Sequence, residues 1–382
     1  MEIYLDNSAT TMAYPECGEL VRSVMVGEYG NPSSLHRKGI EAEKIVKTAT
    51  KRIADTIKVS EKEIYFVSGG TEGDNLAILG TAAAKRGRHI ISSGIEHPAV
   101  LNTLEYLEGK NYAVSYIPVN KDGRFSVKNF EKIIRPDTIL VTCMLVNNEI
   151  GTIEPIKEMS DILNRKNPGA VFHVDAVQGY GKIPFTAASL GADMITLSSH
   201  KIHGPKGMGA LYIRSGINIK PIIFGGGQQN NIRPGTENVP GIAGFGLAAQ
   251  IANTSLREKA EKMRALRDRL KTGIQKNIPD VKVNTPEEGA APHILNVSFK
   301  GAKSEVILHT LENYGIYVSS GSACSSHKKA PSYVLSAIGL DRAWIDGSIR
   351  FSLSEFTTEQ EIDYTIEKLI TTVDGIRRIM RK

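Results

Sequence analysis

The segment Ser198-Ser-His-Lys201 places a lysine in a setting typical of a catalytic amine. It follows a short apolar run that predicts a strand, and it precedes His203-Gly-Pro-Lys-Gly207, which cannot continue as a helix. A lysine just past a strand end, beside a hydroxyl and an imidazole, suits a Schiff base with an aldehyde cofactor that carries a phosphate. Upstream, His173-Val-Asp-Ala-Val-Gln178 places the carboxylate of Asp175 at another strand end, where a pyridinium nitrogen needs a partner. Lys201 and Asp175 together suggest pyridoxal phosphate (PLP).

A phosphate site is predicted in Ser68-Gly-Gly-Thr-Glu-Gly-Asp-Asn75, between a predicted strand and a helix. Glycines such as Gly70 let the backbone approach a ligand, and amides at a helix N-terminus favour an anion. Thr71 adds a hydroxyl donor. Taken alone, the motif favours an ordinary turn with a helix cap. Beside Ser198 and His200 it predicts a phosphate cup.

Three further polar residues follow predicted strands and could contact the cofactor ring. His97 has a flat imidazole that could stack on a pyridine ring, although a histidine bonded within its own loop is the alternative. Gln178, three residues after Asp175, could donate to the ring hydroxyl. Asn148 could reach the same oxygen or the substrate.

The three cysteines differ in their settings. Cys324 lies in the small polar run 319–326, and His327-Lys-Lys329 follows directly. Exposure and nearby positive charge favour the thiolate, so Cys324 is a candidate reactive thiol. Cys143 lies inside an apolar run and is expected to be a buried core thiol. Cys17 has no partner pattern.

Arg350 lies in a predicted strand with apolar neighbours. An inward-facing arginine needs an anion, and a bidentate grip on an amino-acid carboxylate is a natural match. A surface ion pair is the alternative. His200 and His203 have a spacing found in zinc sites, but no cysteine or third ligand lies nearby in sequence, so we expect no metal.

The elements that must position these residues follow from the hydrophobic pattern. Apolar, β-branched runs alternate with helical patterns through the first two thirds of the chain, which predicts a mostly parallel sheet covered on both faces. Ligands of such sheets bind beyond the carboxyl ends of the strands, where Lys201 and Asp175 both fall. The predicted strands are 64–67, 89–92, 113–117, 138–146, 170–174, 194–197 and 210–213.

A second pattern begins near residue 254. Ser255-Leu-Arg-Glu258 predicts a capping box, and the apolar residues after it recur at helical spacing. Strands and helices follow, and Thr358-Glu-Gln-Glu361 predicts the cap of a terminal helix. We therefore predict an α/β protein with a large domain at residues 12–254 and a smaller α+β domain formed by residues 1–11 and 255–382.

Composition limits the class of protein. A chain of 382 residues favours two domains, and 41% hydrophobic with 23% charged residues is typical of a soluble enzyme. No apolar run reaches the length of a membrane helix, and the first residues do not resemble a signal peptide. Three cysteines cannot form a disulfide framework, so we expect a reducing cytoplasm. The net charge of +6 is scattered, which favours a solvated surface over a nucleic-acid site.

The motifs, taken in order, resemble the cysteine desulfurases of the NifS/IscS type, within the class V aminotransferase group of fold-type I PLP enzymes. The resemblance covers nearly the whole chain, and Ser320-Gly-Ser-Ala-Cys324 points to the first of the two desulfurase subgroups. The segments that carry it are 5–11, 30–36, 68–75, 173–178, 198–201, 233–238 and 320–324.

The resemblance implies a role for each candidate residue. Lys201 would be the Schiff-base lysine, and Asp175 would partner the ring nitrogen. Cys324 would attack the substrate sulfur, and Arg350 would bind the substrate carboxylate. Thr236 would reach the phosphate from a second subunit, which implies a homodimer with shared sites. His97 would stack on the cofactor ring. Gln178 and Asn148 would contact the ring oxygen, and Asn148 would also contact the substrate. The phosphate would be held by Gly70, Thr71, Ser198 and His200.

The implied reaction converts L-cysteine into L-alanine and leaves a persulfide on Cys324. The persulfide would pass to an acceptor such as an iron–sulfur scaffold or a tRNA-thiolation protein. A selenocysteine lyase or another class V PLP aminotransferase is the alternative, and an inactive adaptor that binds sulfur-transfer partners is a further one. A transaminase has no use for a mobile thiol, so Cys324 favours the desulfurase.

Overall fold

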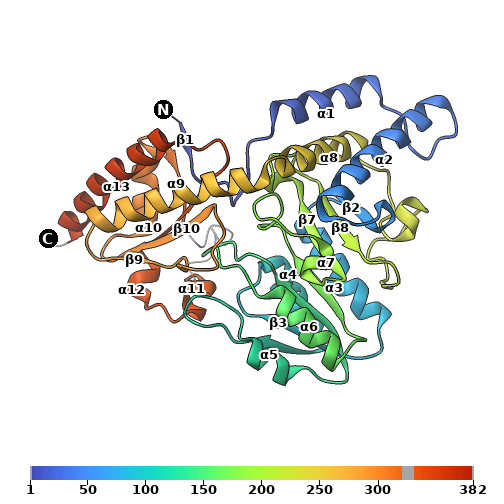
Figure 1. Cartoon of the computed structure of the whole chain (residues 1–382), viewed down its shortest axis with the longest axis horizontal. Helices are drawn as coiled ribbons and strands as arrows, with labels where there is room; N and C mark the ends of the chain where they lie inside the picture. Colours follow the sequence, from blue (N-terminus) through green and yellow to red (C-terminus); the bar gives the residue numbers. More distant parts are fainter. Residues whose placement is uncertain (1, 321–330, 381–382) are drawn as a thin grey trace.

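The chain folds around three β-sheets in a computed structural model that describes residues 2–320 and 331–380 (Figure 1). The largest sheet has seven strands in the order β2-β8-β7-β6-β5-β3-β4. Only β8 runs against its neighbours, so the prediction of an α/β protein with a mostly parallel seven-stranded sheet is confirmed. The strands are β2 (Ile64–Val67), β3 (His89–Ser93), β4 (Ala113–Ile117), β5 (Thr138–Met144), β6 (Val171–Asp175), β7 (Met194–Ser198) and β8 (Gly209–Ile213), each within two residues of its predicted ends.

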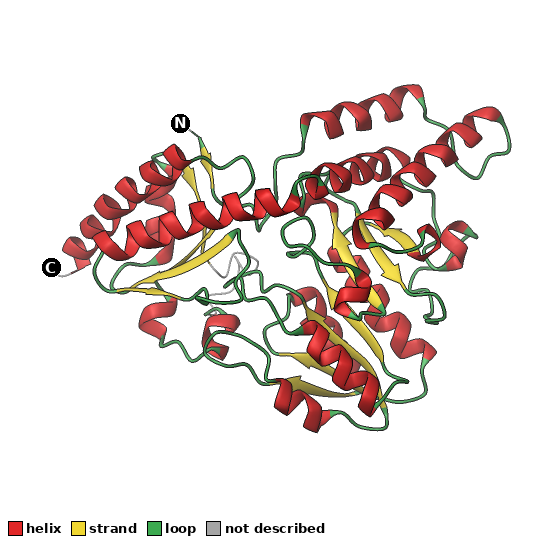
Figure 2. Ribbon diagram, viewed as in Figure 1, coloured by secondary structure: helices red, strands yellow, loops and turns green. Residues whose placement is uncertain are grey.

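Helices cover both faces of this large sheet (Figure 2). Because side chains alternate along a strand, Ile90 and Leu140 pack on one face while Ile91 and Val141 pack on the other. The first face lies against α3 and α4, and the second against α2, α6 and α8. The helices of this part are α1 (Pro15–Gly27), α2 (Arg37–Ile57), α3 (Gly70–Ala84), α4 (Pro98–Glu108), α5 (Val127–Ile133), α6 (Ile156–Lys166), α7 (Ala187–Leu190) and α8 (Val239–Asn253).

A four-stranded antiparallel sheet, in the order β12-β13-β10-β9, forms the second part. Its strands also alternate: Ile349 and Phe351 face an apolar core with α9, α10 and α13, whereas Ser348 and Arg350 point the other way. Figure 1 shows the long helix α9 running from the large sheet to this part. The elements are α9 (Leu256–Asn277), β9 (Val281–Val283), β10 (Ile294–Phe299), α10 (Ser304–Glu312), β12 (Ser319–Ser320), β13 (Ser348–Ser352) and α13 (Glu359–Met380).

The N-terminal segment pairs with the C-terminal part. Strand β1 (Ile3–Tyr4) lies parallel to β11 (Ile316–Tyr317), and Asp6 forms a bridge with Ser352. The short helices α11 (Tyr333–Ala337) and α12 (Arg342–Ile345) complete the fold, and Val334 and Leu335 of α11 pack into the core of the large sheet. The domain limits at residues 12–254 stay a prediction.

The capping prediction at Ser255 is wrong, and the one at Thr358 is confirmed. Only Thr254 and Ser255 separate α8 from α9, and Ser255 takes a left-handed conformation (φ 52°) without a side-chain cap. A capping serine needs an extended backbone, which so short a turn does not allow. At the last helix, the N–H of Thr358 donates to the Glu361 carboxylate (2.7 Å), and the N–H of Glu361 donates to Thr358 Oγ1 (3.3 Å).

Within the described ranges, no helix combines the length and the apolar character needed to cross a membrane.

A close approach between α2 and α8 gives a test of the fold. A Cβ added at Gly246 would lie 2.5 Å from Ala49 Cα, so Gly246→Ala must push the two helices apart. We expect a loss of about 1–3 kcal/mol in the free energy of unfolding, measured by urea denaturation. Gly375→Ala in α13 is the matched control, because nothing lies within 4 Å of its added Cβ; it should gain about 0.5–1 kcal/mol. Equal effects of the two substitutions would contradict this packing.

Candidate functional site

A cavity of about 240 Å³ opens beyond the carboxyl ends of β6 and β7. It brings together residues that are far apart in sequence, because strand ends of a parallel sheet meet at one edge. Nine of the predicted site residues line it: Gly70, Thr71, His97, Asn148, Asp175, Gln178, Ser198, His200 and Lys201.

One end of the cavity is built to accept an anion. The pleat of β7 turns Ser198 toward the first turn of α3, where Gly70 and Thr71 lie. A Cβ at Gly70 would come within 2.9 Å of Val177 Cγ2, so a larger residue here would force Val177 to shift. Ser198 Oγ is buried and has no hydrogen-bond partner among the described residues. A free hydroxyl beside helix N-terminal amides suits a phosphate.

The carboxyl groups of Asp175 and Asp74 form the floor of the cavity. Asp175 is 7% exposed, and one of its oxygens accepts the N–H of Val177 (2.9 Å). Burial raises its pKa, although the Val177 hydrogen bond and the charge of Lys201 oppose the shift. Asp74, on α3, lines the same cavity, and burial followed by repulsion from Asp175 raises its pKa well above the ordinary value. Buried carboxylates need a cation, so this floor suits a protonated ring nitrogen.

Lys201 reaches the cavity from the 3₁₀ turn that follows β7 (Ser199–Lys201). Its Nζ donates to the backbone carbonyls of Ser8 and Ala9, the latter at 2.8 Å. Gln178 Nε2 donates to the same Ser8 carbonyl (3.0 Å). The N-terminal segment therefore forms one wall of the site and orients both side chains. Sequence reasoning missed this wall, because backbone carbonyls leave no residue-type signal.

His97 and His200 are both neutral near pH 7. Burial, and then the charge of Lys201, lowers the pKa of each to about 4. His97 caps α4, with its Nδ1 accepting the N–H of Ala99 (3.2 Å), so its Nε2 carries the proton. His200 Nδ1 lies 3.1 Å from Thr10 Oγ1. An uncharged, fixed imidazole at His97 suits stacking on an aromatic ring.

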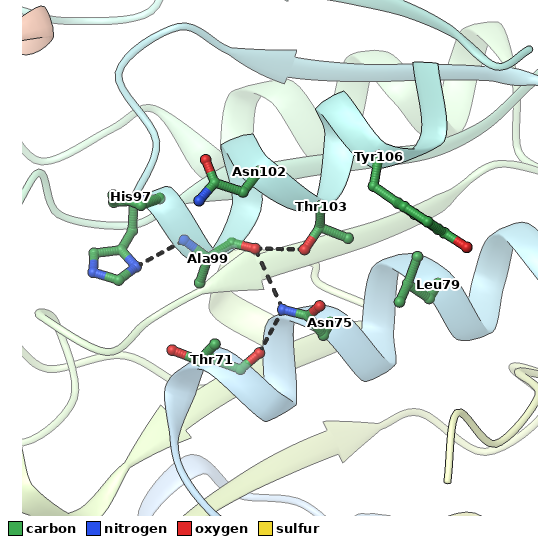
Figure 3. A pocket seen from close by; sticks show the side chains of 9 residues that line it. Thr71, Asn75, Leu79, His97, Ala99, Asn102, Thr103 and Tyr106 are labelled. Carbon is green, nitrogen blue, oxygen red and sulfur yellow. Dashed lines mark hydrogen bonds between the residues drawn. The ribbon is translucent and has the colours of Figure 1, made fainter. Parts of the chain in front are cut away.

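His97 and Thr71 also border a wider groove of about 640 Å³ between α3 and α4. Figure 3 shows Asn75 beside Thr71 on α3, and Asn102 and Tyr106 on α4. Asn75 Nδ2 donates to the Thr71 carbonyl (2.8 Å) and to the Ala99 carbonyl (3.4 Å), which ties the two helices together. The groove and the cavity therefore share Thr71 and His97 in their linings.

Arg350 lies next to the cavity and is not part of its wall. It is 5% exposed; its Nη1 donates to the Asn148 carbonyl (2.9 Å), and its Nη2 pairs with Asp6 Oδ1 (2.8 Å). Its Nε is buried without a partner among the described residues, and the same holds for Asn148 Oδ1. The inward orientation predicted from the strand pattern is therefore present, and Asp6 supplies the anion in this structure.

Of the two remaining predicted residues, one lies away from the cavity wall and one falls outside the described residues. Thr236 is exposed, in the loop that follows the 3₁₀ turn Gln228–Asn231. Arg233 of this loop pairs with Glu72 of α3 (2.8 Å), so the loop lies against the first turn of that helix. Cys324 falls outside the described residues. Asp74, in contrast, lines the cavity without having been predicted, although it belongs to the motif at residues 68–75.

Comparison with known proteins gives one consistent result. The family model Aminotransferase class-V matches residues 3–365. A cysteine desulfurase of Trichormus azollae is 45% identical over 378 residues, which cover 99% of this chain and 94% of that protein. The cysteine desulfurase IscS of Dictyoglomus turgidum is 43% identical over 380 residues, covering 99% and 96%. A solved NifS-like protein has a TM-score of 0.93 at 40% identity and covers 98% of this chain and 100% of its own.

Substitution of Ser198 tests whether the end of the cavity beside α3 binds an anion. Ser198→Ala removes a buried hydroxyl that has no partner in the described part of the chain, so the cofactor-free protein should be as stable as before or more stable by about 1 kcal/mol. The affinity for PLP should fall about tenfold, because the phosphate loses a donor. Ser199→Ala is the control: Ser199 Oγ is equally buried and unpaired among the described residues, but it does not line the cavity. Titration of the cofactor-free proteins with PLP would contradict the assignment if both variants bound equally well.

Proposed function

The chain belongs to the aminotransferase class-V family, and on this premise we propose that it is a cysteine desulfurase, which takes the sulfur of L-cysteine and leaves L-alanine. One observation carries the proposal: an amine, a buried carboxylate and an anion-binding helix end meet in a single cavity. They do so in a chain 45% identical to the Trichormus azollae cysteine desulfurase over nearly its whole length.

Three features of the cavity support PLP as the cofactor. The N-terminus of α3, with Thr71 and the unpaired Ser198 hydroxyl, suits the phosphate. Asp175 suits the protonated ring nitrogen, and Lys201 Nζ suits the aldehyde. When bound, PLP supplies an aromatic system that takes up electrons from the Cα of an amino acid.

The residues of the cavity wall then have separate roles in the reaction. Lys201 Nζ takes the proton from the substrate Cα, and the nearby carbonyls of Ser8 and Ala9 orient the amine. The neutral ring of His97 would cover one face of the cofactor ring. Gln178 and Asn148 would contact the ring oxygen, and Gln178 Nε2 has a second N–H for that contact beside the one it donates to the Ser8 carbonyl.

Arg350 is the proposed site of the substrate carboxylate, with Asn148 beside it. Its buried Nε has no partner among the described residues, so an incoming carboxylate would satisfy it. Asp6 already occupies Nη2, so substrate binding requires Arg350 to share or exchange this carboxylate. A planar guanidinium with several donors can serve two anions in this way.

The sulfur step belongs to Cys324. Its thiolate attacks the sulfur of the substrate, the C–S bond breaks, and the carbon takes the electron pair and a proton. L-Cysteine and a thiol thus become L-alanine and a persulfide on Cys324, with no oxidant needed. The persulfide then passes to the thiol of an acceptor protein, such as an iron–sulfur scaffold or a tRNA-thiolation protein.

We also propose a cytoplasmic homodimer with shared sites. Thr236 is exposed on a loop that lies against α3, and the groove shares Thr71 with the cavity. Thr236 of a second copy would complete the phosphate site through this groove. Cys17 and Cys143 are free buried thiols, as expected in a reducing compartment.

Replacing the thiol tests the reaction. In Cys324→Ser, alanine formation from L-cysteine should fall about a hundredfold or more, because a hydroxyl cannot accept the sulfur. Borohydride reduction followed by mass spectrometry should still find the cofactor on Lys201. Cys17→Ala, the control, should keep normal turnover, since Cys17 is buried away from the cavity. Undiminished turnover in Cys324→Ser would rule out this role.

Mixed dimers test the shared site. Lys201→Ala should be inactive, and Thr236→Asp should be impaired because its carboxylate repels the phosphate. If Thr236 of one subunit completes the partner's site, a dimer of one Lys201→Ala subunit and one Thr236→Asp subunit contains one intact site. An equal mixture of the two variants should then recover about a quarter of wild-type activity. If Thr236 instead completes the site of its own subunit, both sites of the mixed dimer are damaged, and mixing restores no activity.

A further inference from the structure

Two adjacent side chains fasten the start of α11 to loops that carry site residues. Ser332 Oγ donates to Glu149 Oε2 (2.5 Å) and accepts the N–H of Leu335 (3.1 Å) as the cap of the helix. Tyr333 OH donates to the backbone carbonyl of Glu96 (2.7 Å). Helix α11 is therefore attached to the large sheet at two separate points.

Both acceptors are direct chain neighbours of the proposed site residues. Glu149 follows Asn148, and Glu96 precedes His97. Ser332 comes eight residues after Cys324. The two contacts therefore set where the chain leaves the thiol-bearing segment, relative to the cavity.

The opposite end of this segment is also placed beside the site, by the small sheet. Ser319 of β12 pairs with Arg350 of β13. After Ser332, in contrast, Val334 and Leu335 pack into the core of the large sheet. The chain that carries Cys324 thus starts on one sheet and ends on the other.

Glu149 provides a rigid support. It is 3% exposed, its N–H donates to Asn147 Oδ1 (2.9 Å), and its carbonyl accepts Asn296 Nδ2 (3.2 Å). Burial raises the pKa of its carboxyl to about 7, while the Ser332 hydrogen bond and Arg350 oppose the shift. A buried carboxyl that loses its donor is costly, so the contact with Ser332 is a strong constraint on both residues.

We propose that the pairs Ser332–Glu149 and Tyr333–Glu96 form a two-point anchor that positions Cys324 for the sulfur-transfer step. Ser332, Tyr333 and Glu149 are then positioning residues, which act through the thiol and touch neither substrate nor cofactor. The inference rests on the proposed function, because it assigns a purpose to the position of Cys324.

The test separates cysteine binding from sulfur transfer in the PLP-loaded protein. Stopped-flow absorbance follows cysteine binding at the cofactor, and alkylation with mass spectrometry follows persulfide on Cys324 in a single turnover. In Glu149→Ala and Tyr333→Phe, persulfide formation should slow about tenfold, the effect of one lost hydrogen bond on a precise alignment, with cysteine binding within twofold of wild type. Glu149→Gln keeps an acceptor for Ser332 and should restore the rate to within about threefold.

Two controls match the chemistry of the changes at a distance from the site. Tyr112 also donates its hydroxyl to a backbone carbonyl, that of Ala82 (2.9 Å), so Tyr112→Phe should leave both steps unchanged. Ser126 caps α5 as Ser332 caps α11. Ser126→Ala therefore controls for the loss of a helix cap in Ser332→Ala. Ser332→Ala should slow persulfide formation, and Ser126→Ala should leave it unchanged.

A measurement without the cofactor reports the anchor directly. Hydrogen exchange of peptides covering residues 331–340 should be about tenfold faster in Glu149→Ala than in wild type, because the start of α11 loses an attachment. Exchange and persulfide rates at wild-type values in both Glu149→Ala and Tyr333→Phe would overturn the proposal, and so would equal losses in cysteine binding and sulfur transfer. If the wild-type protein formed no persulfide on Cys324, that result would instead contradict the proposed function and, with it, this inference.

Discussion

A carboxylate removed from water needs a positive charge, and this requirement at Asp175 governs the site. Asp175 ends β6 in the middle of a sheet covered on both faces, and burial there penalises its charged form. Lys201, at the end of the neighbouring strand β7, lowers its pKa against the effect of burial. Burial, and then the charge of Lys201, lowers the pKa values of His97 and His200 and leaves both imidazoles neutral. Burial and the charge of Lys201 thus set the protonation of the groups around the cavity.

The pleat of the strands decides which groups share that environment. Residues two apart on a strand face the same way, so His173 and Asp175 of β6 turn toward α3, as Thr196 and Ser198 of β7 do. The N-terminus of α3 then meets Ser198 at one end of the cavity, and Asp74 from the next turn lies near Asp175. A carboxylate floor and an anion-binding end follow from the same alternation.

The small sheet contributes through its polar face. Ser348 and Arg350 point away from the apolar core of that sheet, and Arg350 donates to the Asn148 carbonyl across the boundary. Asn296 makes the equivalent contact with the Glu149 carbonyl. Arg350 and Asn296 are both buried, so these hydrogen bonds would be costly to lose and they hold the two sheets in one alignment.

The sequence by itself determined the seven strands, the motifs at their ends and the family. These depend on local patterns: apolar runs for strands, and Lys201 and Asp175 just past them. It failed at Ser255, where the two-residue turn between α8 and α9 overrode the capping pattern.

Only the tertiary structure decided that the carbonyls of Ser8 and Ala9 orient Lys201, that Asp6 pairs with Arg350, and that Ser332 meets Glu149. Such contacts join residues more than 180 positions apart, and backbone carbonyls carry no residue-type signal. They depend on how two sheets pack together, which no local pattern in the chain encodes.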